Sequence, residues 1–254
     1  MKKSIIPNFC LLLFAIFILS PFLYSLIFFS DNEAFLKNTL LVLRYSKTFH
    51  TGFWNSLIYS VTITTGQLVI SLLAAYAFSC FKFRGRDILF AIVIIVMMMP
   101  HQVTVVPSYI LLQNLNIIDT RGAIILPQLF APFCVFLLRQ NMIHTDLSIL
   151  EAAEIDGANS IKKLIYVVLP VNKGGIYSLI LLKLSENWCL YEAPVSFTTN
   201  KDIQPLSVLI AFLSSSLSIF NIMIVGFLMC IPVLIIYFLF SDSLVEGLGR
   251  STLK

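Results

Sequence analysis

Long apolar stretches alternate with short polar ones along this chain, and the alternation predicts its helices. A run of about 20 residues without a charge is long enough to cross the roughly 30 Å hydrocarbon core of a membrane as a helix. The first such run covers residues 9–29 and follows the basic pair Lys2-Lys3. This start is also typical of a signal peptide, but the run is longer than the apolar core of one and no A-x-A-like site follows it. We therefore expect a retained first helix.

Five further spans are predicted from the same pattern. Their expected ranges are 53–80, 88–112, 123–138, 174–195 and 221–240. Residues 206–240 carry no charge, and they would measure about 52 Å as one helix, which exceeds a single span. We divide this stretch at Ser214-Ser215-Ser216 into an outer or re-entrant helix over 206–216 and the sixth span. The prediction is an all-α, polytopic membrane protein with six transmembrane helices.

The third predicted span carries prolines and polar residues in its middle. Pro100, His101 and Gln102 interrupt it, and Pro107 follows. Such residues are tolerated at membrane depth where protein or water satisfies the freed backbone groups. We therefore expect His101 and Gln102 on the wall of a water-filled path. A catalytic or ligand role for His101 is disfavoured, because no second His, Cys or carboxylate stands near it in the sequence.

The fifth predicted span carries the charged residues Lys183, Glu186 and Glu192. Lys183 and Glu186 are three residues apart, so they share a helical face and can form an ion pair. Charges inside a membrane usually face the bundle interior or a water-filled path. We expect Glu186 and Tyr191 to line the same path as the third span. A structural ion pair near the helix end is the alternative for Lys183 and Glu186.

Composition supports a membrane protein with one transmembrane domain over residues 1–254. Hydrophobic residues make up 58% of the chain and charged residues 12%, and the mean hydropathy is +0.92, values that exclude an ordinary soluble domain. The net charge of +4 is better explained by membrane topology than by nucleic acid. In a six-span topology, eleven Lys and Arg residues share a side with both termini and five lie on the other side. By the positive-inside rule, the termini and the loop over residues 148–170 are cytoplasmic.

The chain lacks the sequence signatures of a nucleotide-binding or catalytic protein. There is no G-x-x-x-x-G-K-[ST] loop, no H-E-x-x-H or G-x-S-x-G motif and no zinc-ligand spacing. The five cysteines stand in apolar stretches without a close pair, as buried free thiols do. We expect no catalytic residue, metal or cofactor in this chain, so a partner must supply any energy for its work.

The loop over residues 148–170 is the longest charge-bearing interruption of the apolar pattern. Ser148 and Glu151 have capping-box spacing, which predicts a helix start. Asp156-Gly157 predicts its end after about two turns, with Gly157 as a left-handed cap. So short a helix needs a surface to dock on. A second, amphipathic helix follows, which we expect to stop at Pro170; its apolar face carries Ile161, Leu164, Ile165, Val168 and Leu169.

This loop resembles that of importer permeases in the ATP-binding-cassette superfamily. The matching residues are Glu151-Ala152-Ala153, Asp156-Gly157-Ala158 and Leu169-Pro170, which are similar to the family's E-A-A, D-G-A and L-P. Further stretches over about 53–240 resemble the carbohydrate (maltose-type) permeases in the same order. They include Phe53–Leu57, Tyr76–Phe78, Phe83–Arg86, Met98–Pro100, Leu115–Thr120, Leu137–Gln140, Trp188 and Pro194.

The resemblance implies a permease subunit of a binding-protein-dependent sugar or oligosaccharide importer in the bacterial cytoplasmic membrane. Such a subunit is not an enzyme: it pairs with a second homologous permease and with a dimer of cytoplasmic subunits that bind ATP and Mg. An extracytoplasmic binding protein delivers the solute, and alternating access moves it across. Carried over to this chain, Glu151 contacts the ATPase, Ala152 and Ala153 permit close approach, and Asp156-Gly157 turns the chain away.

Three alternatives stay open. The nearest is a permease of the same superfamily for glycerol phosphate or amino acids, and a secondary transporter is further off. A membrane-embedded enzyme is the least favoured, because the polar residues form no catalytic cluster. The chain departs from the family in lacking a proline shortly before Glu151 and in its tail, Gly247–Lys254. It also has Trp188-Cys189 in place of the family's Trp-Asn, which predicts that one polar side chain is missing near the pathway. These departures leave the solute undetermined.

Overall fold

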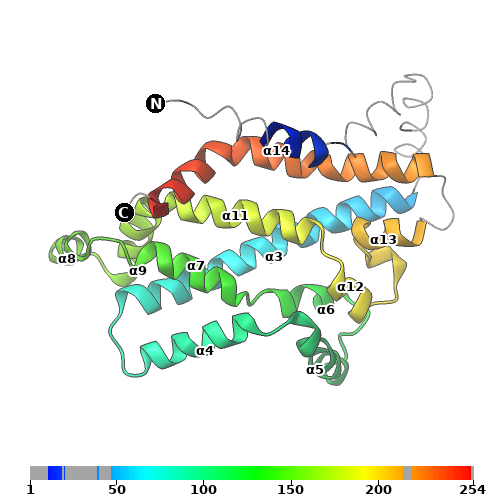
Figure 1. The fold of residues 1–254 in the computed structure, drawn as a ribbon. Coiled ribbons are helices and arrows are strands. Elements are labelled where there is room, and N and C mark those ends of the chain that lie inside the picture. The colour runs from blue at the N-terminus through cyan, green and yellow to red at the C-terminus, as the bar shows by residue number, and fades with distance from the viewer. Residues whose placement is uncertain (1–10, 19, 21–38, 40–46, 214–218, 253–254) are drawn as a thin grey trace.

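The computed structural model describes residues 11–18, 20, 39, 47–213 and 219–252. Within these ranges the protein consists of helices and loops, without a strand (Figure 1). Residues 11–18 and 20 are helical, while the rest of the predicted first span and both chain ends lie outside the described residues. The all-α prediction is confirmed for the described part of the chain.

Helix α3 (Lys47–Cys80) is the central element, and it packs against α7, α11 and α13. It begins six residues before the predicted start at 53. Its buried face consists largely of small and hydroxylated residues, which let neighbouring helices approach closely. A Cβ built at Gly66 would overlap the side chain of Leu129. The buried small residues include Gly52, Ser56, Ser60, Thr64, Ser71 and Ala75.

The third predicted span is broken where its sequence indicated. Helix α4 (Arg86–Met98) ends before Pro100, which is the N-cap of α5 (His101–Asn114). The chain bends sharply between the two helices (Figure 1). Pro107 lies inside α5 without ending it.

The fourth predicted span is also interrupted by its prolines. It consists of α6 (Arg121–Ile125), the short 3-10 helix η1 (Leu126–Gln128) and α7 (Pro132–Met142). Pro132 stands in the first turn of α7, where its missing N–H leaves no hydrogen bond unmade.

The fifth predicted span is shorter than expected. Helix α11 (Lys173–Trp188) stops well before residue 195, and α12 (Glu192–Phe197) follows after a break at residues 189–191. Pro194 explains the break, because a proline ring inside a continuous helix would clash with the carbonyl four residues earlier. Proline is tolerated in the first turn of α12 instead.

The long apolar stretch near the C-terminus contributes two described helices, α13 (Leu206–Leu213) and α14 (Ile219–Thr252). The predicted division at Ser214-Ser215-Ser216 lies outside the described residues and stays a prediction. Helix α11 packs against both α3 and α14. The Nε1 group of Trp188 donates to the carbonyl of Met229 at 3.0 Å, which ties α11 to α14.

The remaining helices gather at the two ends of this bundle. At one end lie α8 (Leu147–Ile155), α9 (Ser160–Lys163), the π-helix η2 (Leu164–Val168), α10 (Leu169–Val171) and the C-terminal end of α14 (Figure 1). At the other end lie α5, α6, α12 and α13; the 3-10 helix η3 (Lys201–Ile203) connects α12 to α13.

Length and apolar composition identify two described helices that could each cross a membrane, Lys47–Cys80 and Arg121–Met142. The number is up to four if each of two bent helix pairs forms one span. Residues 222–238 form a shorter apolar helix within α14. The prediction of six spans stays a prediction.

Candidate functional site

The predicted docking helix exists as α8, but its N-cap is Asp146 and not Ser148. The Asp146 carboxylate accepts a hydrogen bond from the backbone N–H of Ser148 at 2.9 Å. This hydrogen bond holds the pKa of Asp146 below its usual range. A carboxylate satisfies a free N–H at a helix start and also favours the positive end of the helix dipole. The capping-box prediction was therefore wrong, and Glu151 has no capping role.

The end of α8 is the one predicted. Gly157 is left-handed, with a φ of 80°. The N–H of Ala158 donates to the carbonyl of Ala153 at 2.9 Å, and the N–H of Gly157 donates to that of Glu154 at 3.0 Å. These two bonds form a Schellman motif, which satisfies the last carbonyls of the helix and reverses the chain.

One face of α8 is held by the bundle and the opposite face is exposed. Leu150 is buried in a cluster with Leu164 and Val168. Glu151, Ala152, Asp156 and Gly157 are exposed, and Ala153 is half-buried. Ile155, at the tip, is 88% exposed. An exposed apolar residue beside small alanines gives this helix a surface that another protein can cover.

The two glutamates of α8 differ in their partners. The Glu154 carboxylate lies 2.7 Å from Lys163 Nζ on α9, and this hydrogen bond and charge hold the pKa of Glu154 below its usual range. Within the described part of the chain, no hydrogen bond or ion pair involves the Glu151 carboxylate. Glu151 therefore presents a negative charge at the exposed face of α8.

The second half of the loop does not stop at Pro170. After α9, residues 164–168 form the π-helix η2, and Leu169 donates to the carbonyl of Leu164, five residues earlier. Pro170 then falls in the first turn of α10, and the chain breaks at Asn172. The π-helix explains why the chain continues past Pro170. Proline has no N–H to donate, and its ring clashes with the carbonyl four residues earlier in a regular helix. Both are accommodated where the i→i−4 hydrogen bonds are already interrupted.

Hydrogen bonds join this loop to the bundle. The amide of Asn172 donates to Thr145 Oγ1 and to the carbonyl of Val168, both at 2.9 Å. The Tyr76 hydroxyl, on α3, donates to the carbonyl of Ser160 at 3.1 Å. A Cβ at Gly175 would lie 2.6 Å from Asn141 Cγ, so the start of α11 packs directly on α7. The loop and α11 are thus one connected unit.

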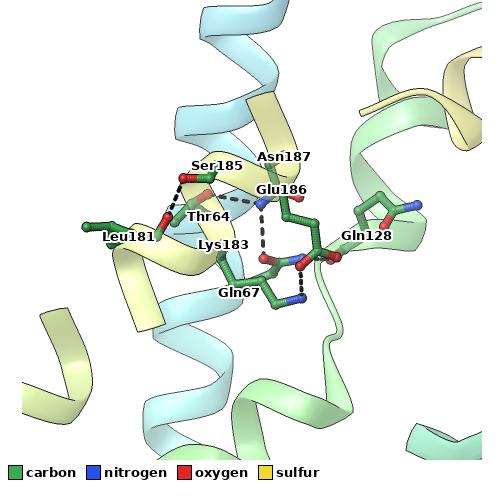
Figure 2. Close-up of polar contacts among 8 residues, drawn as sticks. All are labelled: Thr64, Gln67, Gln128, Leu181, Lys183, Ser185, Glu186 and Asn187. Carbon is green, nitrogen blue, oxygen red and sulfur yellow. Dashed lines mark hydrogen bonds and ion pairs between the residues drawn. The ribbon is translucent and has the colours of Figure 1, made fainter. Parts of the chain in front are cut away.

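In the last turns of α11, side chains form a polar cluster with residues of α3 (Figure 2). Lys183 Nζ lies 2.7 Å from Glu186 Oε2, which confirms the predicted pair. Asn187 is buried and donates to Thr64 Oγ1 at 2.9 Å and to Gln67 Oε1 at 3.1 Å. Gln67 in turn donates to the carbonyl of Gln128 at 2.7 Å. The cluster therefore links α11, α3 and η1.

A cavity of about 590 Å³ lies beside this cluster. Gln67, Gln128, Lys183 and Glu186 line it together with side chains of α4, α5 and α7. The volume falls within the range of pockets for small molecules.

The family comparison covers most of the chain. The family described as "Binding-protein-dependent transport system inner membrane component" matches residues 67–252. This chain belongs to that family. The protein is thus the permease component of a binding-protein-dependent importer of the ATP-binding-cassette superfamily, an inner-membrane transport component and not an enzyme.

Two relatives of this permease are the arabinooligosaccharide transport system permease proteins of Halalkalibacterium halodurans and Bacillus subtilis. They are 26% and 28% identical over 228 and 226 residues, which cover 89% and 88% of this chain and 82% and 78% of the relatives. An sn-glycerol-3-phosphate transport system permease protein of Brucella abortus is 27% identical over 199 residues, 77% of this chain and 71% of that protein.

Among solved structures, a bacterial ABC transporter involved in the import of the acidic polysaccharide alginate resembles the permease, with a TM-score of 0.75 and 21% identity. The match covers 98% of this chain and 96% of the other. At 21% sequence identity, this match establishes that the two proteins share a fold.

The permease does not bring all the predicted pathway residues together. Glu186 lines the cavity. Gln102 donates to Glu192 Oε1 at 3.3 Å, joining α5 to α12. Tyr191 lies in the break after α11 and is 47% exposed. Gln102 and Tyr191 do not line the cavity, and the side chain of His101 lies outside the described residues.

Three polar residues of the permease site were missed by sequence reasoning: Gln67, Asn172 and Asn187. The expectation of a missing polar side chain at Cys189 stays a prediction, while Asn187, on the other side of Trp188, places a buried amide in the cluster. Polar side chains inside apolar runs were the available signal, since buried amides need partners. Their partners could not be named, because Asn187 and Gln67 are 120 residues apart.

At the opposite end of the bundle, hydrogen bonds attach residues 199–204 to α3 and to Asp119, in the turn before α6. Asn55 donates to the carbonyls of Asp202 and Gln204 at 2.8 and 3.1 Å, and Tyr59 donates to that of Ile203 at 2.7 Å. Asp119 accepts hydrogen bonds from the backbone N–H groups of Thr199 and Asn200 and from the Thr199 hydroxyl. These bonds, led by that from the Thr199 N–H, hold the pKa of Asp119 below its usual range.

Proposed function

We propose that this permease imports a sugar or an oligosaccharide. The arabinooligosaccharide permeases, which align with nearly the whole chain, support this class of solute. The glycerol-phosphate permeases support the alternative of a phosphorylated solute over a smaller share of the chain.

The observation that carries the mechanism is the continuity between α8 and α11. The exposed face of α8 belongs to a loop whose end, Asn172, is fixed to Thr145 and leads directly into α11. Helix α11 bears Lys183, Glu186 and Asn187. A displacement of α8 is therefore transmitted to the polar cluster, because packed helices move as rigid bodies. Alternating access that is driven by a partner protein requires such a connection between the docking surface and the pathway.

In this proposal the cytoplasmic ATPase subunits bind α8, with Glu151 as the charged contact. Ala152 and Ala153 permit close approach, and Asp156-Gly157 turns the chain out of the interface. ATP and Mg are held by those subunits. A second homologous permease completes the pathway, and an extracytoplasmic binding protein delivers the solute. The chain is one permease domain over residues 1–254, with a core over about 53–240, six spans and both termini in the cytoplasm. His101, Gln102, Glu186 and Tyr191 are candidates for the pathway.

The test is uptake by proteoliposomes that contain the complete importer, with ATP inside and the binding protein outside. We expect uptake of a neutral oligosaccharide that requires ATP and the binding protein. Uptake of glycerol 3-phosphate alone would favour the second class of solute. Uptake that survives ATP depletion and follows an ion gradient would contradict the importer and favour a secondary transporter.

A further inference from the structure

The two charged side chains that line the cavity beside the polar cluster have opposite charges, which neutralise each other. Among its lining residues, Lys183 and Glu186 are the two with charged side chains, and they are paired at 2.7 Å. The remaining polar lining is neutral and comes from Gln67, Gln128, Thr104 and Ser108. An anionic ligand would have to compete with Glu186 for Lys183, and a cationic ligand would have to compete with Lys183 for Glu186.

Lys183 is held in place from two sides. Its side chain is 10% exposed, and its Nζ lies 5.6 Å from the centre of the Phe133 ring. The Glu186 side chain is 60% exposed, and one of its two oxygens is bonded to Lys183. The other oxygen has no partner in the described part of the chain and can accept a hydrogen bond from a hydroxyl group.

One neutral side chain of the lining, that of Gln67, is fixed before any ligand arrives. Gln67 accepts from Asn187 and donates to the carbonyl of Gln128, so its amide has one orientation (Figure 2). The aromatic side chains of Phe130 and Phe133 line the same cavity. A fixed amide, a carboxylate within an ion pair and apolar ring faces suit a ligand that has both hydroxyl groups and apolar C–H faces.

The geometry points to a binding subsite for an uncharged, polyhydroxylated solute in this cavity, with the Lys183–Glu186 pair setting its charge selectivity. This inference rests on the proposed import function and deepens it: the permease itself selects neutral saccharides over anionic ones at the level of the bundle.

The test uses the complete importer in nanodiscs, so that solute binding is measured without delivery by the binding protein. Ser108→Cys places a reporter thiol in the cavity lining, and its reaction rate with an uncharged maleimide is measured against a chain with the native thiols alone. The probes are a panel of neutral pentose and hexose trisaccharides, including arabinotriose, and sn-glycerol 3-phosphate. At three times its dissociation constant, a protecting trisaccharide slows labelling about fourfold.

Two matched carboxylate variants then separate charge selectivity from general effects. Glu186→Gln keeps the size of the side chain but leaves Lys183 without its counter-charge. We expect glycerol 3-phosphate not to protect the thiol in the parent chain, and to bind the Glu186→Gln chain with an apparent affinity about tenfold higher or more. Glu192→Gln makes the same change in a residue that does not line the cavity. We expect it to leave the pattern of thiol protection unaltered.

The inference is overturned if no neutral trisaccharide protects the thiol, if glycerol 3-phosphate protects the parent cavity more strongly than they do, or if Glu192→Gln acts as Glu186→Gln does. Uptake in proteoliposomes distinguishes this failure from that of the import function. ATP-driven sugar uptake without protection refutes the subsite alone, whereas protection without ATP-driven uptake refutes the proposed function.

Discussion

The side-chain amide of Asn172 donates a hydrogen bond to the hydroxyl of Thr145 at 2.9 Å, and both residues are buried. Thr145 directly precedes the N-cap of α8, and Asn172 directly precedes α11. One hydrogen bond therefore closes the entire loop that carries α8. It also fixes that loop to α11, the helix that lines the cavity beside the polar cluster.

Loss of this bond should loosen the loop. Asn172→Leu leaves the buried Thr145 hydroxyl without its partner, while the Val168 carbonyl keeps its hydrogen bond from the backbone N–H of residue 172. We therefore expect a loss of about 1–3 kcal/mol in the free energy of unfolding. Thr145→Val removes the other partner. The double variant should cost less than the sum of the two single ones, because the two residues share one interaction. Thermal unfolding in detergent measures all three, and strictly additive losses would show that the bond does not couple the residues.

The left-handed glycine at the end of α8 gives a test of loop geometry. A Cβ at Gly157 meets no atom within 4 Å, so Gly157→Ala acts through the backbone alone. Holding alanine at a φ of 80° costs roughly 1–2 kcal/mol. Gly85→Ala is a matched control, because Gly85 has a φ of 87° and the same open surroundings, but lies before α4.

We expect the two alanine variants to lose similar thermal stability. Gly157→Ala alone should lower the transport-coupled ATPase activity of the importer, because it redirects the chain beside the docking face. An equal loss of coupled ATPase activity in Gly85→Ala would mean that stability, and not the position of α8, limits coupling.

Acid should weaken the attachment of residues 198–206 to the rest of the bundle. The ionised Asp119 carboxylate accepts hydrogen bonds from Thr199 and Asn200, so its pKa lies below the ordinary 3.8 of aspartate. A group with a lowered folded pKa stabilises the protein above its unfolded pKa, and this contribution is lost as the pH falls through the folded pKa. Asp119→Asn retains the left-handed backbone, which asparagine tolerates.

Melting temperatures of detergent-solubilised protein between pH 7 and pH 3 test this prediction. The parent chain should melt above Asp119→Asn at neutral pH, and the difference should shrink as the pH falls below about 4. Asp202→Asn removes an exposed carboxylate from the same region, where no hydrogen bond to the side chain of Asp202 is present in the described structure. A pH-independent difference for Asp119→Asn would refute the role of its ionised form.

Sequence pattern was enough for features that depend on neighbours along the chain. The break at Pro100, the cap at Gly157 and the pair of Lys183 with Glu186 follow from local rules of helix geometry. The start of α8 was misplaced because Asp146 and Ser148 are both good N-caps two residues apart, and local rules do not choose between them.

Features that depend on distant partners could not be predicted. The π-helix before Pro170 forms where Leu164 and Val168 are buried against the bundle, so tertiary packing decides it. Asn187, which lies two residues before Cys189, could not be assigned to the polar cluster from the sequence. Its hydrogen bonds to α3 depend on how α11 packs, which no period along α11 reveals.

The central claim is that α8 receives the motion of the ATPase through its exposed face, with Glu151 as the charged contact. Its most direct test is pull-down of the tagged permease in mild detergent, with mass spectrometry of the proteins that accompany it. The parent chain should recover an ATPase and a second permease, and Glu151→Arg should lose the ATPase while retaining the second permease. Asp87→Arg reverses an exposed charge in the first turn of α4 and should recover both. Recovery of the ATPase by Glu151→Arg at the parent level would contradict the account.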